Sequence, residues 1–134
     1  MSLADILTPN ETEAEGLTGM PVRNIEDATA AAERLLARGV GTVVLTLGAK
    51  GALVHSPKIH RLVPAVDAGP VVDTTGAGDA FNGGLAVALA QGKELVDAVR
   101  FACAVAGISV TRPGTAPSMP KRTEVEALVA ESAA

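Results

Sequence analysis

Residues 71–89 read VVDTTGAGDAFNGGLAVAL, and the expected fold follows from this stretch. Its two valines predict the end of a strand, its glycines predict a tight turn, and the small residues over 80–92 predict a helix. The first amides of a helix have no partner within it and carry partial positive charge, and glycines let an anion approach them closely. The turn therefore predicts a phosphate site formed by the amides of Gly76, Ala77 and Gly78.

A carboxylate, Asp79, follows this turn directly. It would repel a bound phosphate unless a third group lay between them. A substrate hydroxyl is such a group, because the carboxylate can accept its proton while the oxygen attacks the phosphorus. The structural alternative is that the glycines only permit close strand-helix packing and Asp79 only favours the first helical turn. Two other phosphate motifs do not fit, since Phe81 replaces the third glycine of a dinucleotide fingerprint and no lysine completes a Walker A loop.

The composition predicts one globular domain at most, because the chain has 134 residues and 48% of them are hydrophobic. There are 11 basic and 15 acidic side chains, with no basic cluster, which makes nucleic acid an unsuitable partner. A single cysteine, Cys103, excludes an internal disulfide framework and fits a reducing compartment. Without a signal peptide or a bilayer-length apolar run, we expect a cytoplasmic protein that is not bound to membranes.

The remaining pattern predicts an α/β fold. The expected elements are a strand at 4–7, a helical turn capped by Asn10 or Thr12, a surface helix over 24–39, a strand over 40–47 buried in a parallel sheet, a strand at 52–55, short strands at 60–63 and 64–66, and helices over 94–111 and 123–130. The glycine turn before residue 52 is also typical of a simple hairpin. His55 and His60, without a further metal ligand at suitable spacing, are predicted to be surface residues.

The segment DTTGAGDAFNGG, residues 73–84, closely resembles the second signature of the ribokinase (PfkB) family of carbohydrate kinases. The resemblance implies that Asp79 is the catalytic base and that the Gly76, Ala77 and Gly78 amides form the anion hole. It covers residues 1–134 as the C-terminal half of a family member, a partial ribokinase-like domain. The implied fold is a layered α/β/α sheet, without the N-terminal sugar-binding half and the lid.

Two further segments resemble nucleotide-binding parts of that family. The spacing Asn10-x-x-Glu13 is similar to its NxxE motif, which implies that Asn10 contacts a nucleotide phosphate and that Glu13 belongs to the magnesium environment, mainly through water. The segment TLGAKG, residues 46–51, resembles the loop along the nucleotide phosphates, and Cys103 falls near the adenine. The implied ATP contacts are Asn10, Thr46, Leu47, Gly48, Ala49, Lys50, Gly51, Gly78, Asp79 and Cys103.

The loop after residue 109 resembles the family segment that surrounds a monovalent cation beside the anion hole. The implied K⁺ ligands are the side chain of Asp73, the carbonyl of Thr75, backbone oxygens of Ser109, Arg112 and Gly114, and Ser118. The alternative is a plain loop that ends a helix, with Asp73 bonding the turn.

The resemblance implies an ATP-dependent sugar kinase that uses Mg²⁺ and K⁺, with ribokinase as the first expectation. We expect the chain to be inactive alone, because the strands that supply most sugar contacts are absent. The alternatives are a non-catalytic nucleotide-binding fragment or another family member, such as a fructokinase or nucleoside kinase. Open sheet edges left by the missing strands favour a homo-oligomer.

Overall fold

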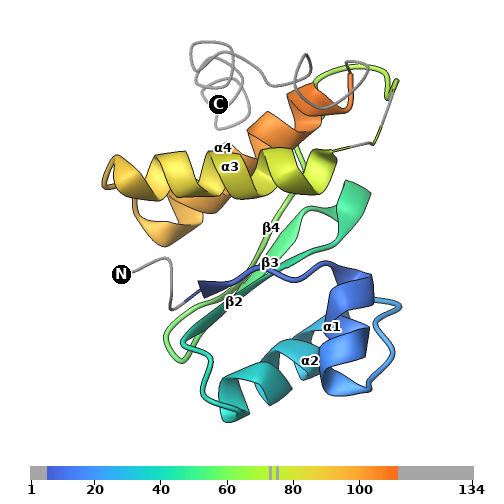
Figure 1. Ribbon diagram of the computed structural model, residues 1–134, viewed down its shortest axis with the longest axis vertical. Coiled ribbons are helices and arrows are strands. Elements are labelled where there is room, and N and C mark those ends of the chain that lie inside the picture. Colours follow the sequence, from blue (N-terminus) through green and yellow to red (C-terminus); the bar gives the residue numbers. More distant parts are fainter. Residues whose placement is uncertain (1–5, 73, 75, 112–134) are drawn as a thin grey trace. The chain divides into compact units, whose positions relative to one another are not determined.

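The computed structural model describes residues 6–72, 74 and 76–111, which form two compact units, Met1–Val63 and Pro64–Ala134 (Figure 1). The first unit contains, in chain order, β1 (Ile6–Leu7), α1 (Glu11–Thr18), α2 (Ile25–Ala37), β2 (Thr42–Thr46), the 3₁₀ turn η2 (Gly48–Lys50), β3 (Ala52–His55) and β4 (His60–Val63). The second contains α3 (Ala77–Ala90) and α4 (Leu95–Ser109). The predicted α/β fold is confirmed. The helix expected over 123–130 lies outside the described residues.

The four strands of the first unit form one mixed sheet in the order β1-β2-β3-β4. β1 pairs with β2 in parallel, whereas β2–β3 and β3–β4 are antiparallel. β2 therefore has the expected parallel neighbour on one side only, and the glycine turn before residue 52 forms a hairpin with its other neighbour. The connection from β2 to β3 is too short for a parallel arrangement of these strands. The turn η2 reverses the chain within three residues, Gly48–Lys50, whereas a parallel crossover needs a dozen or more residues.

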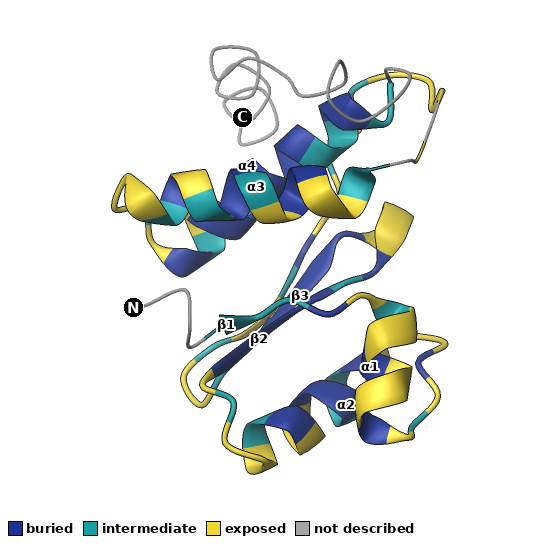
Figure 2. Cartoon of the chain, viewed as in Figure 1, coloured by how far each residue is buried: buried dark blue, intermediate teal, exposed yellow. Residues whose placement is uncertain are grey.

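Helices α1 and α2 cover one face of this sheet (Figure 1). Along α2, buried residues recur at helical spacing between exposed ones (Figure 2). The core consists of the buried side chains of Ala14, Val22, Ala28, Ala31, Ala32, Leu35, Val43, Leu45, Leu47 and Leu53. Val44, which points to the other face of β2, is also fully buried. Burial on both faces explains why the sequence of β2 is a nearly continuous apolar run.

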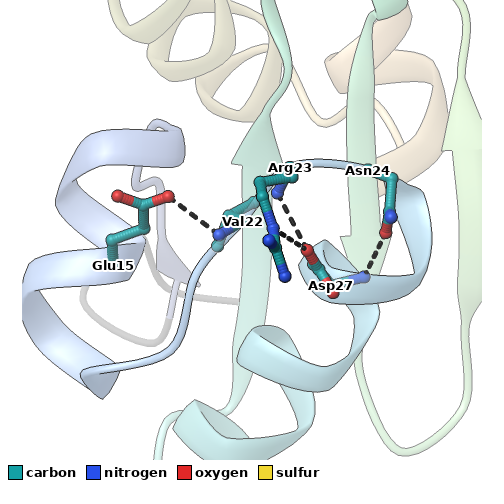
Figure 3. Close-up of polar contacts among 5 residues, drawn as sticks. All are labelled: Glu15, Val22, Arg23, Asn24 and Asp27. Atoms are coloured by element: carbon teal, nitrogen blue, oxygen red, sulfur yellow. Dashed lines mark hydrogen bonds and ion pairs between the residues drawn. The ribbon is translucent and has the colours of Figure 1, made fainter.

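The connection between α1 and α2 is held by two carboxylates (Figure 3). Glu15 accepts a hydrogen bond from the amide of Val22 at 2.8 Å. Asp27 accepts from the amide of Arg23 at 3.1 Å, while Asn24 caps the helix by accepting from the Asp27 amide at 2.8 Å. These bonds satisfy backbone donors at the start of α2 and fix its position after α1.

In the second unit, α3 and α4 pack closely against each other along their small residues. A Cβ atom on Gly84 would lie 2.8 Å from a methyl group of Val105 and 3.3 Å from the Cα atom of Ala102. Only glycine permits this separation of the two helices. The small-residue helix predicted after the turn is thus confirmed as a close-packing element.

The segment before α3 differs from the expectation. Val71 and Val72 form no strand in the described part of the chain and are 67% and 62% exposed. The amide of Val72 donates to the carbonyl of Val110 at 2.7 Å, at the end of α4. A strand needs a neighbouring strand for its backbone groups, and here a helix end takes the amide instead. The predicted strand at residues 71–72 is wrong, although the turn and the helix that follow it are present.

Candidate functional site

The turn before α3 has the geometry of an open helix start. Gly76 precedes the helix in the left-handed conformation, with φ 79° and ψ 5°, which favours glycine. The first regular helical bond runs from the amide of Ala80 to the carbonyl of Gly76 at 2.9 Å. The helix therefore begins at Ala77, three residues before the predicted boundary. The amides of Ala77, Gly78 and Asp79 consequently have no acceptor within the helix.

One of these amides is used in the turn itself, since Ala77 donates to the carbonyl of Thr74 at 3.2 Å. No described residue accepts a hydrogen bond from the amides of Gly76, Gly78 or Asp79. Both Gly78 and Asp79 are exposed, and a Cβ atom on Gly78 would meet nothing within 4 Å. Unpaired amides beside open space at a helix start can hold an anion. The anion-hole role of Gly76, Ala77 and Gly78 stays a prediction, and in this geometry the amide of Ala77 would first have to leave the carbonyl of Thr74.

The side chain of Asp79 is accessible to a substrate. It is the third residue of α3 and the acid of its first turn. An exposed carboxylate beside open amides can accept a proton from a hydroxyl held at the same place. A carboxylate at this position also interacts favourably with the helix dipole, which is the structural role.

A second group of predicted residues gathers at the carboxyl edge of β1 and β2. Asn10 and Thr46 form an isolated parallel bridge, and the amide of Thr46 donates to the carbonyl of Pro9 at 2.9 Å. The start of α1 therefore lies beside the start of the loop 46–51. This is the edge at which open α/β sheets bind their ligands.

Asn10 and Glu13 form a capping box at the start of α1. The Oδ1 atom of Asn10 accepts from the amide of Glu13 at 2.7 Å, and Oε1 of Glu13 accepts from the amide of Asn10 at 3.0 Å. The capped helix predicted here is confirmed. Within the described part of the chain, each side chain uses one polar atom, which leaves the Nδ2 donor of Asn10 and the second oxygen of Glu13 for a ligand. The structural and nucleotide-binding roles are thus compatible.

Asn10→Asp should separate these two roles. Aspartate retains an oxygen that caps the helix, so the free energy of unfolding should change by less than about 0.5 kcal/mol. Nucleotide affinity should fall, because a carboxylate replaces an amide donor and repels a phosphate. Urea unfolding and calorimetric titration with ADP check the two expectations. Equal ADP affinities for the parent and the variant would contradict a phosphate contact by Asn10.

The loop 46–51 presents its backbone rather than its side chains. Gly48 and Gly51 have φ values of 58° and 106°, in the region that favours glycine, and residues 48–50 are exposed. The amides of Leu47, Lys50 and Gly51 are used within the turn. No described residue accepts from those of Gly48 and Ala49. Leu47 is 6% exposed and belongs to the core, so it can contact a nucleotide only through its backbone.

The predicted cation ligands fall mostly outside the described residues: Asp73, Thr75, Arg112, Gly114 and Ser118. Ser109 is described, and lies fully buried at the end of α4. Over the described ranges, no three metal-ligating side chains cluster. A single carboxylate, Glu13, fits Mg²⁺ that keeps most of its water and is held chiefly by substrate phosphates.

Cys103 lies on α4 and is 5% exposed. Burial raises the pKa of its thiol from 9.0 to about 11, against an opposing effect of Arg100. The thiol is therefore protonated at neutral pH and is a poor nucleophile. Its buried position makes it part of the packing of α4, and its nearness to adenine stays a prediction.

Ionisation of Cys103 should lower the free energy of unfolding at alkaline pH. Its folded pKa is raised, so its contribution is complete below pH 9.0 and is lost as the pH rises through about 11. Urea unfolding of the parent and Cys103→Ala across this window should show the parent losing about 2 kcal/mol more than the variant. If the free energy of unfolding fell equally in the parent and in Cys103→Ala, a raised pKa of the Cys103 thiol would be contradicted.

The structure brings together two residues that the sequence analysis treated separately. His55 and His60 are cross-strand partners in β3 and β4, with their Nδ1 atoms 2.7 Å apart. His60 is exposed, as predicted, whereas His55 is only partly exposed. Their symmetric placement around a four-residue turn containing Pro57 was the signal that could have revealed the pair.

Comparisons with known proteins identify relatives of this chain. The family model of the pfkB family carbohydrate kinases matches residues 1–122. The chain is 46% identical to ribokinase from Haemophilus influenzae over 124 residues, which are 92% of this chain and 40% of that protein. No described helix has the length and apolar character needed to cross a membrane.

Solved structures of a ribokinase and of a phosphofructokinase also match this chain. One of Arabidopsis thaliana ribokinase complexed with ribose and ATP matches 93% of this chain and 40% of its own, with 41% identity and a TM-score of 0.88. Phosphofructokinase-2 from Escherichia coli in complex with potassium matches 96% of this chain and 41% of its own, with 25% identity and a TM-score of 0.84. The chain thus spans about 40% of the length of these relatives. With its family model matched over residues 1–122, this chain belongs to the pfkB family of carbohydrate kinases.

Proposed function

We propose that this chain carries the ATP-binding and phosphoryl-transfer part of a ribokinase-like sugar kinase. In this proposal, the amides of the turn at Gly76–Gly78 hold the transferred phosphoryl group, and Asp79 accepts the proton of the sugar hydroxyl that attacks it. Asn10 and the loop 46–51 contact the nucleotide phosphates. The observation that carries the proposal is the helix start at Ala77, where the exposed carboxylate of Asp79 lies beside the amides of Gly76 and Gly78, from which no described residue accepts a hydrogen bond.

Mg²⁺ would be held by the nucleotide phosphates and, through water, by Glu13, and would supply charge neutralisation during transfer. K⁺ would be surrounded by Asp73, Thr75, Ser109 and the loop 112–118. The E. coli relative in complex with potassium supports including this ion. A cytoplasmic location and self-association through the sheet edges stay predictions.

Calorimetric titration of the chain with ADP, in the presence of Mg²⁺ and K⁺, tests the nucleotide-binding part. We expect one ADP per chain, with affinity reduced when Mg²⁺ or K⁺ is omitted. A folded sample, verified by its helical circular dichroism, that takes up no ADP would refute the proposal.

A second candidate is nucleotide binding without transfer. It is supported by the bridge between Asn10 and Thr46 at the start of the loop 46–51, a candidate phosphate site that does not involve Asp79. A coupled kinase assay with ribose, deoxyribose, fructose and nucleosides discriminates between the two. Turnover by the chain alone would exclude the second candidate, whereas ADP binding without turnover of any sugar would favour it. The preferred sugar in the active protein would identify the kind of family member.

A further inference from the structure

The end of the β3–β4 hairpin carries two converging imidazoles. His55 and His60 are directly opposite in the register of the two strands, and their rings meet edge to face with centroids 4.8 Å apart. The turn between them is tight, because the amide of Ser56 donates to the carbonyl of Ile59 at 2.7 Å and the hydroxyl of Ser56 accepts from the amide of Ile59 at 3.0 Å. The backbone therefore holds the two rings at one place.

We propose that His55 and His60 together bind one divalent transition-metal ion of the class that prefers imidazole, such as Zn²⁺, Ni²⁺ or Cu²⁺. Zinc–imidazole bonds are about 2.0–2.1 Å long, so two nitrogens on one tetrahedral ion lie about 3.3 Å apart. The Nδ1 atoms are 2.7 Å apart in the metal-free pair. Small rotations of the two side chains accommodate the ion, and water molecules complete its coordination.

The charges around the pair support a cation site. The carboxylate of Glu33 interacts electrostatically with His55, and a nearby carboxylate favours a cation. Arg61 is the cross-strand partner of Val54, and successive residues of a strand point to opposite faces, so its guanidinium lies on the other side of the hairpin.

The composition of the chain makes this site simple to detect. These are its only two histidines, and its only cysteine, Cys103, is buried. No cluster of three metal-ligating side chains occurs within the described residues. Any imidazole-dependent binding of Zn²⁺ therefore reports on this pair alone, and an ion bound there would link β3 to β4. The inference does not depend on the proposed kinase function.

Titration of the ¹⁵N-labelled chain with ZnCl₂, followed by NMR of the histidine ring nitrogens, tests the proposal. We expect both rings to shift together and to saturate at one Zn²⁺ per chain. His55→Gln and His60→Gln should each weaken binding by at least about tenfold, because each leaves one ligand without its chelating partner. Arg61→Gln, a neighbouring change on the opposite face, should bind Zn²⁺ like the parent.

Zn²⁺ should also raise the thermal unfolding temperature of the parent and of Arg61→Gln, but not of the two histidine variants. The proposal is overturned if only one ring responds in the parent, or if no ring responds at millimolar Zn²⁺. It is also overturned if either histidine variant binds Zn²⁺ as tightly as the parent. The titration of the parent decides the question without any substitution, so a poorly folded variant does not affect the outcome.

Discussion

Replacing Asp79 with asparagine should abolish phosphoryl transfer while leaving nucleotide binding in place. Asparagine retains the size of the side chain but cannot accept the proton of the attacking hydroxyl, and loss of a general base typically costs about 10²–10⁴ in kcat. The measurement uses a chimera in which this chain replaces the matching segment of the Haemophilus influenzae ribokinase, its relative with 46% identity. A coupled assay gives kcat, and calorimetry with ADP gives the affinity.

Asp97 provides a matched control for this experiment. It is the third residue of α4, as Asp79 is the third residue of α3, and each is the acid of its helix's first turn. Asp97→Asn therefore removes a comparable interaction with the helix dipole, about 0.3–1 kcal/mol, together with the exposed ion pair to Arg100 at 3.2 Å, without removing the proposed base. If both variants kept the kcat of the parent chimera, Asp79 would have only the structural role.

Gly107→Ala should destabilise the second unit by about 1–3 kcal/mol, although alanine is normally the better helix former. Gly107 lies within α4, where a Cβ atom would stand 2.3 Å from the carbonyl oxygen of Val66. That contact is far shorter than van der Waals separation, and its partner is backbone. The loop containing Val66 is also tied to the end of α4 by the hydrogen bond from Val72 to Val110. Urea unfolding followed by circular dichroism measures the loss.

Gly16→Ala is the control for Gly107→Ala. Gly16 lies in α1, and a Cβ atom there would meet nothing within 4 Å. The same substitution should stabilise this helix by roughly 0.5–1 kcal/mol, because it removes only the entropic cost of glycine. A stabilising effect of Gly107→Ala would show that the loop at Val66 moves away without cost, and would contradict the close packing described above.

Much of the local structure was predictable because it depends on neighbouring residues. The capped start of α1 follows from Asn10 and Glu13, whose side chains reach each other's amides within one helical turn. The open start of α3 follows from Gly76, which alone adopts the required backbone angles without strain. The pattern of α2 likewise predicted its buried face. In each case, residues close in the sequence supply both the signal and the interaction.

The errors concern pairings between distant segments. Val71 and Val72 favour a strand by their side chains, yet the amide of Val72 is taken by the end of α4. The continuous apolar run of β2 indicated burial on both faces but not whether its next neighbour was parallel or antiparallel. That choice was made by the short reversal at η2.

By itself, the sequence determined the α/β class, the glycine turn with its adjacent acid, and the capped helix with its NxxE spacing, since short-range sterics and hydrogen bonding specify all three. Only the tertiary structure decided that Asn10 lies beside Thr46, that Gly107 must lack a side chain, and that His55 faces His60. These depend on strand register and on helix and loop packing, where residues far apart in the chain compete for the same backbone partners and the same space.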